Sequence, residues 1–349
     1  MNTAIPKPCQ KYKSIELFAG GGGLALGLEL AGFEAVLLNE KNKTACETLR
    51  QNRPHWNVVE GSVEKLDFSQ HNGTIDLVSG GFPCQAFSTA GQQLGFADVR
   101  GTMFFEYARA VKEIQPKIFV AENVKGLLKH DGGKTLNTIK AVIAEIGYTL
   151  ITPEVLKAVC YNVPQKRERI FLIAVRNDLA KNINFEWPTP SDKVLTLKDA
   201  LQAGDLYSCN VPDSIGPGYL PRKKEIMAMV PPGGDWRNLP VDIQKEYMKN
   251  YFYSSGGRTG VARRLSWDKP CPTLTCSPAQ TQTEYCHPAE VRPLAVREFA
   301  RIQTFPDSWG FCGSMTAQYT QIGNAVPVNL AFLIGKSLIK LLNNINNDK

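Results

Sequence analysis

The residue best placed to do chemistry in this chain is a cysteine in a loop bordered by glycines. Cys84 follows the apolar run Ile75–Val78 and the pair Gly80-Gly81, with Pro83 before it and Gln85 after it. A thiol attacks carbon only as the thiolate, and a loop at the carboxyl end of a strand allows an ionisation that an apolar core suppresses. Buried, unreactive cysteines are commoner. The proline and the polar neighbours argue against burial here, so we predict that Cys84 is a nucleophile.

A carboxyl and two guanidinium groups are expected near this thiol. Glu122 follows the predicted strand 118–121, and in a parallel sheet that strand ends at the same edge as the strand before Cys84. Arg167 and Arg169 stand at alternate positions before an apolar run, so they would share one side if the strand begins early. Fixed guanidinium donors there could hold a carbonyl oxygen. Taken singly, a helix cap for Glu122 and salt bridges for the arginines are alternative interpretations.

A glycine-rich segment predicts a nucleotide-type ligand. Residues 18–23, Phe-Ala-Gly-Gly-Gly-Gly, join a predicted strand to a predicted helix, where a ligand can approach backbone N–H groups. Glu40 lies twenty residues beyond Gly20, at the end of the next strand, where a carboxylate can accept the hydroxyls of a ribose. The spacing also fits a dinucleotide fingerprint, so NAD and S-adenosylmethionine both remain open, as does a tight turn without a ligand.

The elements that must position these groups alternate between strand and helix. Strands are predicted at 14–19, 35–39, 75–79 and 118–121, and helices at 24–31, 43–53, 102–114 and 134–146. This alternation is typical of an α/β fold, a mostly parallel sheet with helices on both faces. Two further β-rich runs, 149–159 and 170–175, are expected to pair antiparallel at the edge of the sheet.

Composition changes at Trp187–Pro190, where proline, glycine, tyrosine and basic residues replace the regular alternation. We expect a second, smaller, loop-rich domain there. Helical patterns return at 294–303 and 331–342. The predicted organisation is a catalytic domain whose first part is 1–187, an insert at 188–291, and a C-terminal catalytic part at 292–349.

Size and charge restrict the class of protein. The chain has 349 residues, 43% of them hydrophobic, no run of eighteen apolar residues and no apolar segment at its N-terminus, so we expect a cytoplasmic globular protein without a membrane span. Its nine cysteines lack metal-site spacing. The net charge of +7 includes basic clusters at 166–169, 222–224 and 258–264, which would attract a polyanion such as nucleic acid or simply form a solvated surface.

With Cys84, Glu122 and Arg169 in view, the chain resembles the DNA (cytosine-5)-methyltransferases over its whole length except the insert. The blocks that carry the resemblance occur in the family's order: 18–23, Asn39-Glu40, Pro83-Cys84-Gln85, Glu122-Asn123-Val124, 165–169, 292–307 and 321–327. The resemblance implies a Rossmann-like, S-adenosylmethionine-dependent fold. It also implies that the insert is a target recognition domain, where Thr273-Leu274 resembles the family's Thr-Leu pair.

The resemblance further implies which residues bind the cofactor S-adenosylmethionine. They are Phe18, Ala19, Gly20, Gly22, Gly23, Asn39, Glu40, Ser62, Val63, Pro83, Met103 and Asn324. One departure concerns adenine: Gly61-Ser62-Val63 stands where the family usually has Gly-Asp-Ile, whose Asp accepts the adenine amino group.

The implied reaction transfers a methyl group to C5 of a cytosine rotated out of duplex DNA. Cys84 would add to C6, Glu122 would hold N3 with a proton, and Arg169, supported by Arg167, would hold the O2 carbonyl. Residues 85–100 would form a lid. The residues expected to contact DNA are Gln85, Ser88, Arg258, Arg263 and Thr273. No metal is expected, and a bacterial modification enzyme acting as a monomer is the default.

Three rival functions remain at this point. An RNA (tRNA) cytosine-5 methyltransferase would use the same scaffold, although the long insert favours DNA. A catalytically silent DNA-binding protein would be expected to lack the nucleophile or the acid, and both are present. An NAD-dependent oxidoreductase would give Cys84, Glu122 and Arg169 no shared task.

Overall fold

The structure is a computed structural model, and it describes residues 12–83, 102–181, 184–253, 258–280 and 283–347. The chain forms two compact units. The first comprises Met1–Tyr161, Glu168–Pro190 and Val326–Lys349, and the second Asn162–Arg167 and Ser191–Ala325.

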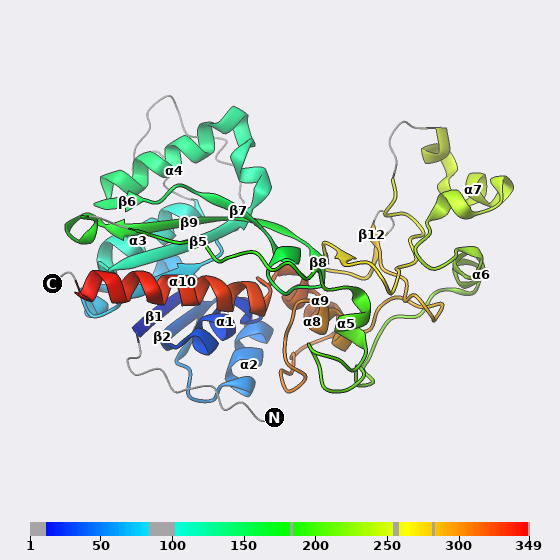
Figure 1. Cartoon of the computed structure of the whole chain (residues 1–349), viewed down its shortest axis with the longest axis horizontal. Helices are drawn as coiled ribbons and strands as arrows, with labels where there is room; N and C mark the ends of the chain where they lie inside the picture. Colours follow the sequence, from blue (N-terminus) through cyan, green and yellow to red (C-terminus); the bar gives the residue numbers. More distant parts are fainter. Residues whose placement is uncertain (1–11, 84–101, 182–183, 254–257, 281–282, 348–349) are drawn as a thin grey trace. The chain divides into compact units, whose positions relative to one another are not determined.

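A single twisted sheet organises the first unit (Figure 1). Its strands are β1 (Tyr12–Leu17), β2 (Phe33–Glu40), β3 (Val58–Glu60), β4 (Leu77–Gly80), β5 (Ile118–Val124), β6 (Tyr148–Leu150), β7 (Glu154–Lys157) and β9 (Glu168–Arg176). The order is β3-β2-β1-β4-β5-β9-β6, and β7 also pairs with β9. Strands β1 to β5 run parallel, whereas β9 is antiparallel to β5, β6 and β7. The predicted parallel sheet and the antiparallel pairing of the two later β-rich runs are confirmed.

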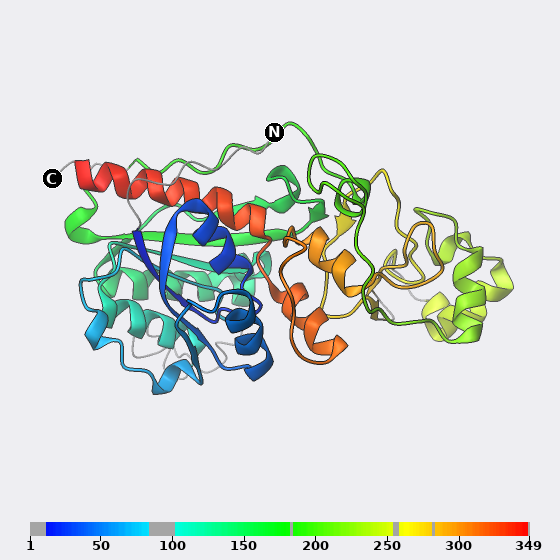
Figure 2. The ribbon, with the colours of Figure 1, turned by 90° about the horizontal axis from the view of Figure 1, so that it is seen from below.

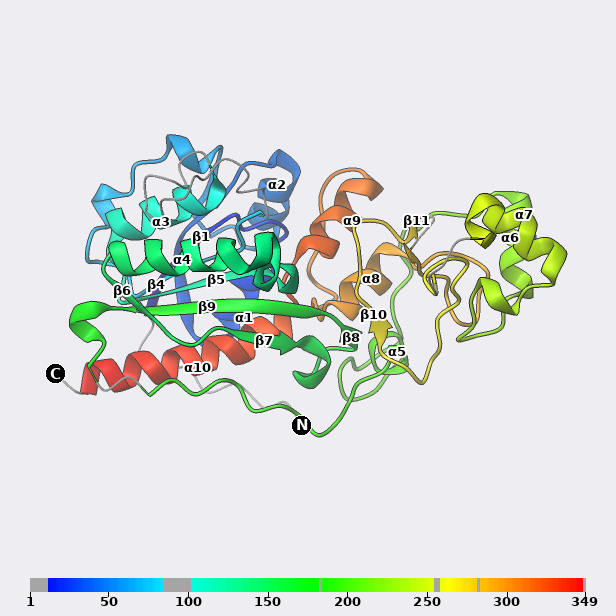
Figure 3. The ribbon, with the colours of Figure 1, turned by 90° about the horizontal axis from the view of Figure 1, so that it is seen from above.

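Helices cover both faces of this sheet. They are α1 (Gly23–Ala31), α2 (Lys43–Asn52), α3 (Met103–Ile114), α4 (Lys134–Glu145) and α10 (Val328–Asn347). Figures 2 and 3 show α10 on one side of the sheet and α3 and α4 on the other. Short 3-10 turns complete the unit: η1 (Val63–Lys65), η2 (Ser69–His71), η4 (Lys125–Leu128), η5 (His130–Gly133), η6 (Ala158–Cys160) and η7 (Asn177–Leu179).

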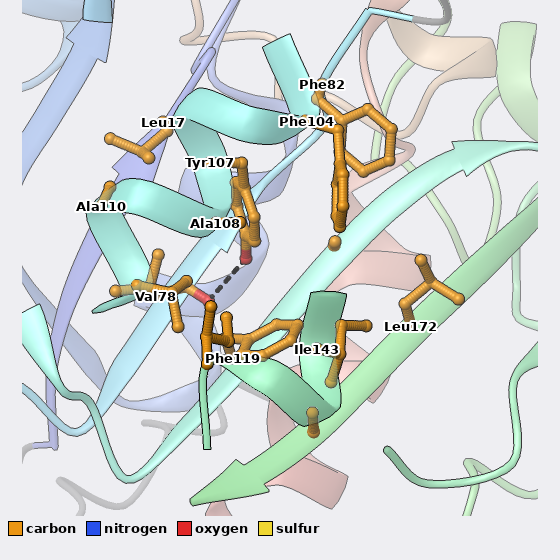
Figure 4. Packing of buried hydrophobic residues seen from close by; sticks show 14 of the residues in the cluster. Leu17, Val78, Phe82, Phe104, Tyr107, Ala108, Ala110, Phe119, Ile143 and Leu172 are labelled. Carbon is orange, nitrogen blue, oxygen red and sulfur yellow. Dashed lines mark hydrogen bonds between the residues drawn. The ribbon is translucent and has the colours of Figure 1, made fainter. Parts of the chain in front are cut away.

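Most side chains at the centre of the sheet are apolar and buried, as expected of parallel strands covered by helices on both sides. Figure 4 shows side chains of α3 and α4 packed against β4, β5 and β9. Tyr107 is one of two tyrosines in this core, and its hydroxyl lies 2.9 Å from the Val120 carbonyl and 3.2 Å from the Val78 carbonyl. Tyr107 therefore links the two strands, β4 and β5, that lead to Cys84 and to Glu122.

Helices α1 and α10 pack closely at two glycines. A Cβ atom at Gly27 would lie 2.4 Å from the Ala331 Cβ, and one at Gly335 would lie 2.6 Å from the Ala31 Cβ. By length and composition alone, the stretch 315–347 could cross a membrane. However, 61% of its most apolar 18-residue segment is buried inside the protein. The apolar character of α10 is therefore explained by its packing against α1.

The second unit contains more helix than its composition predicted. Its elements are β8 (Gln165–Lys166), α5 (Leu197–Leu201), α6 (Pro221–Met229), η8 (Trp236–Asn238), α7 (Val241–Met248), η9 (Lys249–Tyr253), β10 (Cys271–Pro272), β11 (Ala279–Gln280), β12 (Thr283–Glu284), α8 (Val296–Ile302) and α9 (Met315–Asn324). Helices α6 and α7 lie side by side around a small core that includes Ile226, Met227 and Met248 (Figures 1 and 3).

The compact units do not divide the chain where the predicted domains do. Residues 292–325 pack within the second unit, although the resemblance assigns 292–349 to the catalytic part. Compactness and function are different criteria, so the division into a catalytic and a target recognition domain stays a prediction.

Candidate active site

The carboxyl ends of the parallel strands gather the predicted site residues of the first unit. The strand order reverses between β1 and β4, because β2 and β3 lie on one side of β1, and β5 lies beyond β4. Ligands of open α/β sheets bind at this kind of switch point. The loops after β1 and β4 start here, and they lead to the glycine-rich segment and to Cys84.

The loop after β1 has an unusual backbone. Phe18 has φ +57°, Gly20 +54° and Gly22 +86°. A positive φ is strained for a bulky residue and easy for glycine, so the loop turns sharply at these positions. A Cβ atom at Gly20 would meet nothing within 4 Å. The surface at Gly20 is therefore open to a ligand.

Glu40, at the end of β2, holds this loop in place. Its Oε2 accepts a hydrogen bond from the Gly20 amide and its Oε1 from the Asn42 amide, both at 2.8 Å. A carboxylate has about four acceptor positions, so the same side chain can also accept hydroxyl groups of a ligand. The remaining predicted cofactor residues of this loop, Ala19 and Gly23, are buried beside it.

The next strand end carries the predicted adenine contact. Asn39 is buried and its Nδ2 donates to the Val59 and Gly61 carbonyls, which fixes the turn that follows β3. The Ser62 hydroxyl donates to Glu64 Oε2 at 3.0 Å, so its oxygen keeps acceptor capacity. Val63 is buried, whereas Met103, at the start of α3, is half-buried against the same core.

A buried acid that sequence reasoning missed lies directly under the glycine loop. Glu16, on β1, is 4% exposed and accepts a 3.1 Å hydrogen bond from the Ser79 hydroxyl on β4. The Ala25 backbone, at the third position of α1, also bonds to this carboxyl. Helix α1 has Gly22 at its N-cap and no side-chain cap, so Glu16 serves as the cap from below. Burial raises the pKa of Glu16 to about 8. A charged residue inside the run Ile15-Glu16-Leu17 was the available signal.

Glu122 and Arg169 form an ion pair at the edge of the sheet. Strand β9 runs antiparallel to β5, and Arg169 lies opposite Val124, so its start meets the end of β5. The Arg169 Nε lies 2.7 Å from Glu122 Oε1, and the two side chains are 13% and 11% exposed. Burial lowers the pKa of Arg169, and the neighbouring Glu122 opposes that shift. The predicted acid and one predicted arginine are therefore in contact.

The segment that leads to Cys84 is fixed beside this ion pair. The Phe82 carbonyl accepts a 3.0 Å hydrogen bond from Asn123 Nδ2. A Cβ atom at Gly81 would lie 2.9 Å from Glu122 Oε2, so a larger residue there would require the carboxylate to shift. Pro83 is exposed at the end of the described segment. Cys84, Gln85 and Ser88 lie outside the described residues.

Arg167 does not share a strand with Arg169. The two arginines were expected to lie on one side of a strand if that strand began before Arg167. Strand β9 begins at Glu168, and β8 ends at Lys166 because it pairs with β10 instead. Arg167 lies in the second unit, where it is 1% exposed and donates to the Leu274 carbonyl at 3.3 Å. The predicted support of Arg169 by Arg167 stays a prediction.

The other predicted residues of the second unit fall into two groups. Thr273 is exposed and its hydroxyl donates to the Lys166 carbonyl at 2.6 Å, while Asn324 Oδ1 lies 3.2 Å from the Cys276 thiol. The guanidinium of Arg258 lies 4.4 Å above the ring of Tyr251, which is 52% exposed. Arg263 instead donates to the Glu284 carbonyl and lies over the Tyr285 ring.

Much of the predicted basic surface is used internally. Arg264 donates to three backbone carbonyls, Arg222 pairs with Glu225 and Glu246, and Lys223 pairs with the buried Glu284. Within the described parts of the chain no group of three or more His, Cys, Asp or Glu residues is arranged to bind a metal ion. The described part of the first unit brings an acid, a guanidinium and an open glycine-rich loop to one edge of the sheet.

Comparison with known proteins agrees with this arrangement. A family model described as C-5 cytosine-specific DNA methylase matches residues 12–340. The Type II methyltransferase M.Eco47II of Escherichia coli is 64% identical over 335 residues, which cover 96% of this chain and 80% of that protein. The Type II methyltransferase M.Sau96I of Staphylococcus aureus is 50% identical over 340 residues, covering 96% and 77%.

Solved structures share the fold. The crystal structure of the S. pombe Dnmt2 methyltransferase matches with a TM-score of 0.63 and covers 96% of this chain and 100% of that one. Its sequence identity is 17%, so the match concerns the architecture alone.

Proposed function

The chain belongs to the C-5 cytosine-specific DNA methylase family and is a DNA (cytosine-5)-methyltransferase, and we propose that it methylates a flipped-out cytosine through a covalent Cys84 intermediate. The observation that carries this proposal is the Glu122–Arg169 pair beside the segment that leads to Cys84. An acid and a guanidinium in contact can bind the N3 and O2 atoms of one cytosine ring.

The chemistry explains why these groups are needed together. C5 of cytosine is a poor nucleophile, and addition of the Cys84 thiolate to C6 would move electron density to C5. Glu122 would hold a proton at N3 and Arg169 would hold O2 as negative charge builds on the ring. After methylation, loss of the C5 proton breaks the bond between sulfur and C6. Since C6 lies inside the base stack of a duplex, the cytosine must be rotated out, at a cost of a few kcal/mol.

The first unit fits S-adenosylmethionine, which supplies the methyl group on a sulfonium. The open surface at Gly20 admits a ligand to the loop backbone, and Glu40 has acceptor positions left for ribose hydroxyls. Ser62, with Glu64 behind it, would accept the adenine amino group in place of the family's Asp. Asn39 would shape this pocket by holding the turn at Gly61.

Duplex DNA is the proposed substrate, in the setting of a Type II restriction-modification system. Two of the relatives, at 64% and 50% identity, are named Type II methyltransferases. The half-buried Arg258, which lies over the exposed Tyr251 ring, and the exposed Thr273 would contact the DNA from the second unit.

A product assay tests the substrate and the position of methylation together. The purified chain, tritiated S-adenosylmethionine and plasmid DNA should give labelled 5-methyldeoxycytidine after enzymatic digestion. A tRNA mixture in a parallel reaction should remain unlabelled. Label in tRNA but not in DNA would contradict the proposal and establish the RNA methyltransferase instead.

A substitution separates the role of Glu122 from a structural one. Glu122→Gln should lower kcat by about a hundredfold because the amide cannot supply a proton to N3, while the Kd for S-adenosylmethionine stays unchanged. Glu168→Gln is the matched control, since Glu168 pairs with the exposed Lys125 near the same edge. An equal loss of cofactor affinity in Glu122→Gln would indicate a structural role.

A further inference from the structure

Two glutamine side chains form a buried pair inside the second unit. Gln165 and Gln303 are both 0% exposed, and Gln165 Nε2 donates to Gln303 Oε1 at 2.8 Å. They come from segments 138 residues apart in the sequence. Burial of an amide is unfavourable unless its donors and acceptors are satisfied. The further hydrogen-bond partners of the two glutamines therefore show which segments the pair holds together.

Gln165 joins the pair to the segment that carries Thr273. Its Oε1 accepts a 2.9 Å hydrogen bond from the Leu274 amide. The Leu274 carbonyl in turn accepts a 3.3 Å hydrogen bond from the Arg167 guanidinium. Strands β8 and β10 pair alongside, and the Thr273 hydroxyl donates to the Lys166 carbonyl. Arg167 and Thr273 are therefore fixed in one backbone arrangement.

Gln303 joins the pair to the end of α9. Its Nε2 donates to the Ile322 carbonyl at 2.7 Å and to the Ala325 carbonyl at 3.1 Å, the two carbonyls on either side of Asn324. A Cβ atom at Gly323 would lie 2.3 Å from the Thr275 carbonyl oxygen, so the turn that carries Asn324 also packs directly on the backbone next to Leu274.

We propose that Gln165 and Gln303 are positioning residues, which hold Arg167, Thr273 and Asn324 in one hydrogen-bonded group. The inference rests on the proposed function, which gives these three residues roles toward the target base, the DNA and the cofactor. Because one buried amide pair connects all three, order imposed on one segment by its ligand favours the bound arrangement of the other two.

Methionine substitutions test the pair, since methionine has a similar length and offers no amide. Gln165→Met should raise the KM for duplex DNA and lower kcat, each by about tenfold, while the Kd for S-adenosylhomocysteine changes by less than about twofold. Gln303→Met should also weaken S-adenosylhomocysteine binding by about tenfold, because the turn at Asn324 loses both of its donors. The control is Gln318→Met, since the Gln318 Nε2 donates to the Gly313 carbonyl at the surface.

The double variant tests whether the contributions of Gln165 and Gln303 are coupled. The combined Gln165→Met and Gln303→Met variant should lose less than the product of the two single losses, since either change alone already removes the hydrogen bond between the two side chains. Multiplicative losses in kcat/KM would overturn the proposal. So would unchanged kinetic constants in variants that lose only thermal stability.

Hydrogen exchange measured on the unmodified chain tests the proposal without relying on the folding of a variant. Addition of S-adenosylhomocysteine alone should slow exchange at 163–167, 271–276 and 322–325 together. Protection limited to 322–325 would overturn the proposal. A chain that forms no 5-methylcytosine would instead refute the proposed function, and the exchange result would still report on the coupling.

Discussion

Arg169 and Glu122 neutralise each other at 2.7 Å in a largely buried position, and this contact shapes the chemistry at the scale of single residues. A desolvated pair keeps both groups close to the place that the proposed mechanism gives to the cytosine ring. Arginine is suited to it because its planar fork can hold the carboxylate and a base carbonyl at the same time. A lysine at this position would keep the charge and lose that geometry.

The first prediction follows from this difference. Arg169→Lys should lower kcat by about tenfold to a hundredfold with little change in the Kd for S-adenosylmethionine. Steady-state kinetics and equilibrium binding measure the two quantities. Arg176→Lys is the control, because Arg176 ends the same strand and pairs with the exposed Asp178. A loss of similar size in the control would show that the strand, and not the guanidinium at the site, is sensitive.

The second prediction concerns Glu16, whose pKa burial raises from 4.5 to about 8. A raised folded pKa means that this group stabilises the fold most at low pH, and that the stabilisation is lost as pH rises from about 4.5 through 8. Glu16→Gln should remove this loss, which is of the order of 2–4 kcal/mol.

Urea unfolding of both proteins at several pH values checks the effect. The free energy of unfolding of the unmodified chain should fall more steeply between pH 5.5 and about 8.5 than that of the variant. Parallel pH profiles would contradict the role given to Glu16.

At the scale of elements, the alternation of strands and helices was readable because each element has its own local pattern. Strands β1, β2 and β4 and helices α1 to α4 begin and end within two residues of their predicted bounds, whereas β5 runs three residues further than predicted, to Val124. The break between β8 and β9 was not readable. Residues 165–169 look like the start of one strand, and it is the pairing of β8 with the distant β10 that separates Arg167 from Arg169.

Helices α6 and α7 were missed for a related reason. Their helical character depends on a small core assembled from distant segments, which includes Val261 and Cys286. Proline and glycine nearby obscured the pattern. At the site, the residue types of the motifs were informative, whereas the link from Asn123 to the Phe82 carbonyl depends on the sheet order.

The third prediction belongs to the contact between α1 and α10. Gly27→Ala should destabilise the protein by about 2–3 kcal/mol, because the new methyl would meet the Ala331 side chain and α10 backbone atoms within 2.7 Å. Thermal or urea unfolding measures the change. Gly126→Ala is the control, since its Cβ would be 3.8 Å from the nearest side-chain atom. Equal stability of Gly27→Ala and the unmodified chain would show that the helices can separate without cost.

At the scale of the whole molecule, the net charge of +7 does not show which positive side chains are free to bind DNA. Arg222, Lys223, Arg263 and Arg264 are committed to contacts within the second unit. Arg258 is stacked on an exposed tyrosine. The charged residues can be counted in the sequence, but only the folded structure shows which of them are paired.

The fourth prediction uses this distinction. Arg258→Gln should weaken binding to duplex DNA and reduce the slope of log K against log salt concentration by about one, as expected for one lost phosphate contact. Arg237→Gln is the control, because Arg237 pairs with Asp235 in the same unit. Fluorescence anisotropy over a range of salt concentrations measures both. Identical slopes for Arg258→Gln and the unmodified chain would remove Arg258 from the DNA-binding surface.

In the proposed mechanism, the thiol of Cys84 bonds to a cytosine held by Glu122 and Arg169. Duplex DNA that contains 5-fluorocytosine blocks the final proton loss and should therefore trap the intermediate when S-adenosylmethionine is present. Mass spectrometry should find a denaturation-resistant adduct on the peptide that contains Cys84, and none with Cys84→Ala. An adduct on the Cys84→Ala chain, or its absence from an unmodified chain that methylates ordinary DNA, would contradict the account.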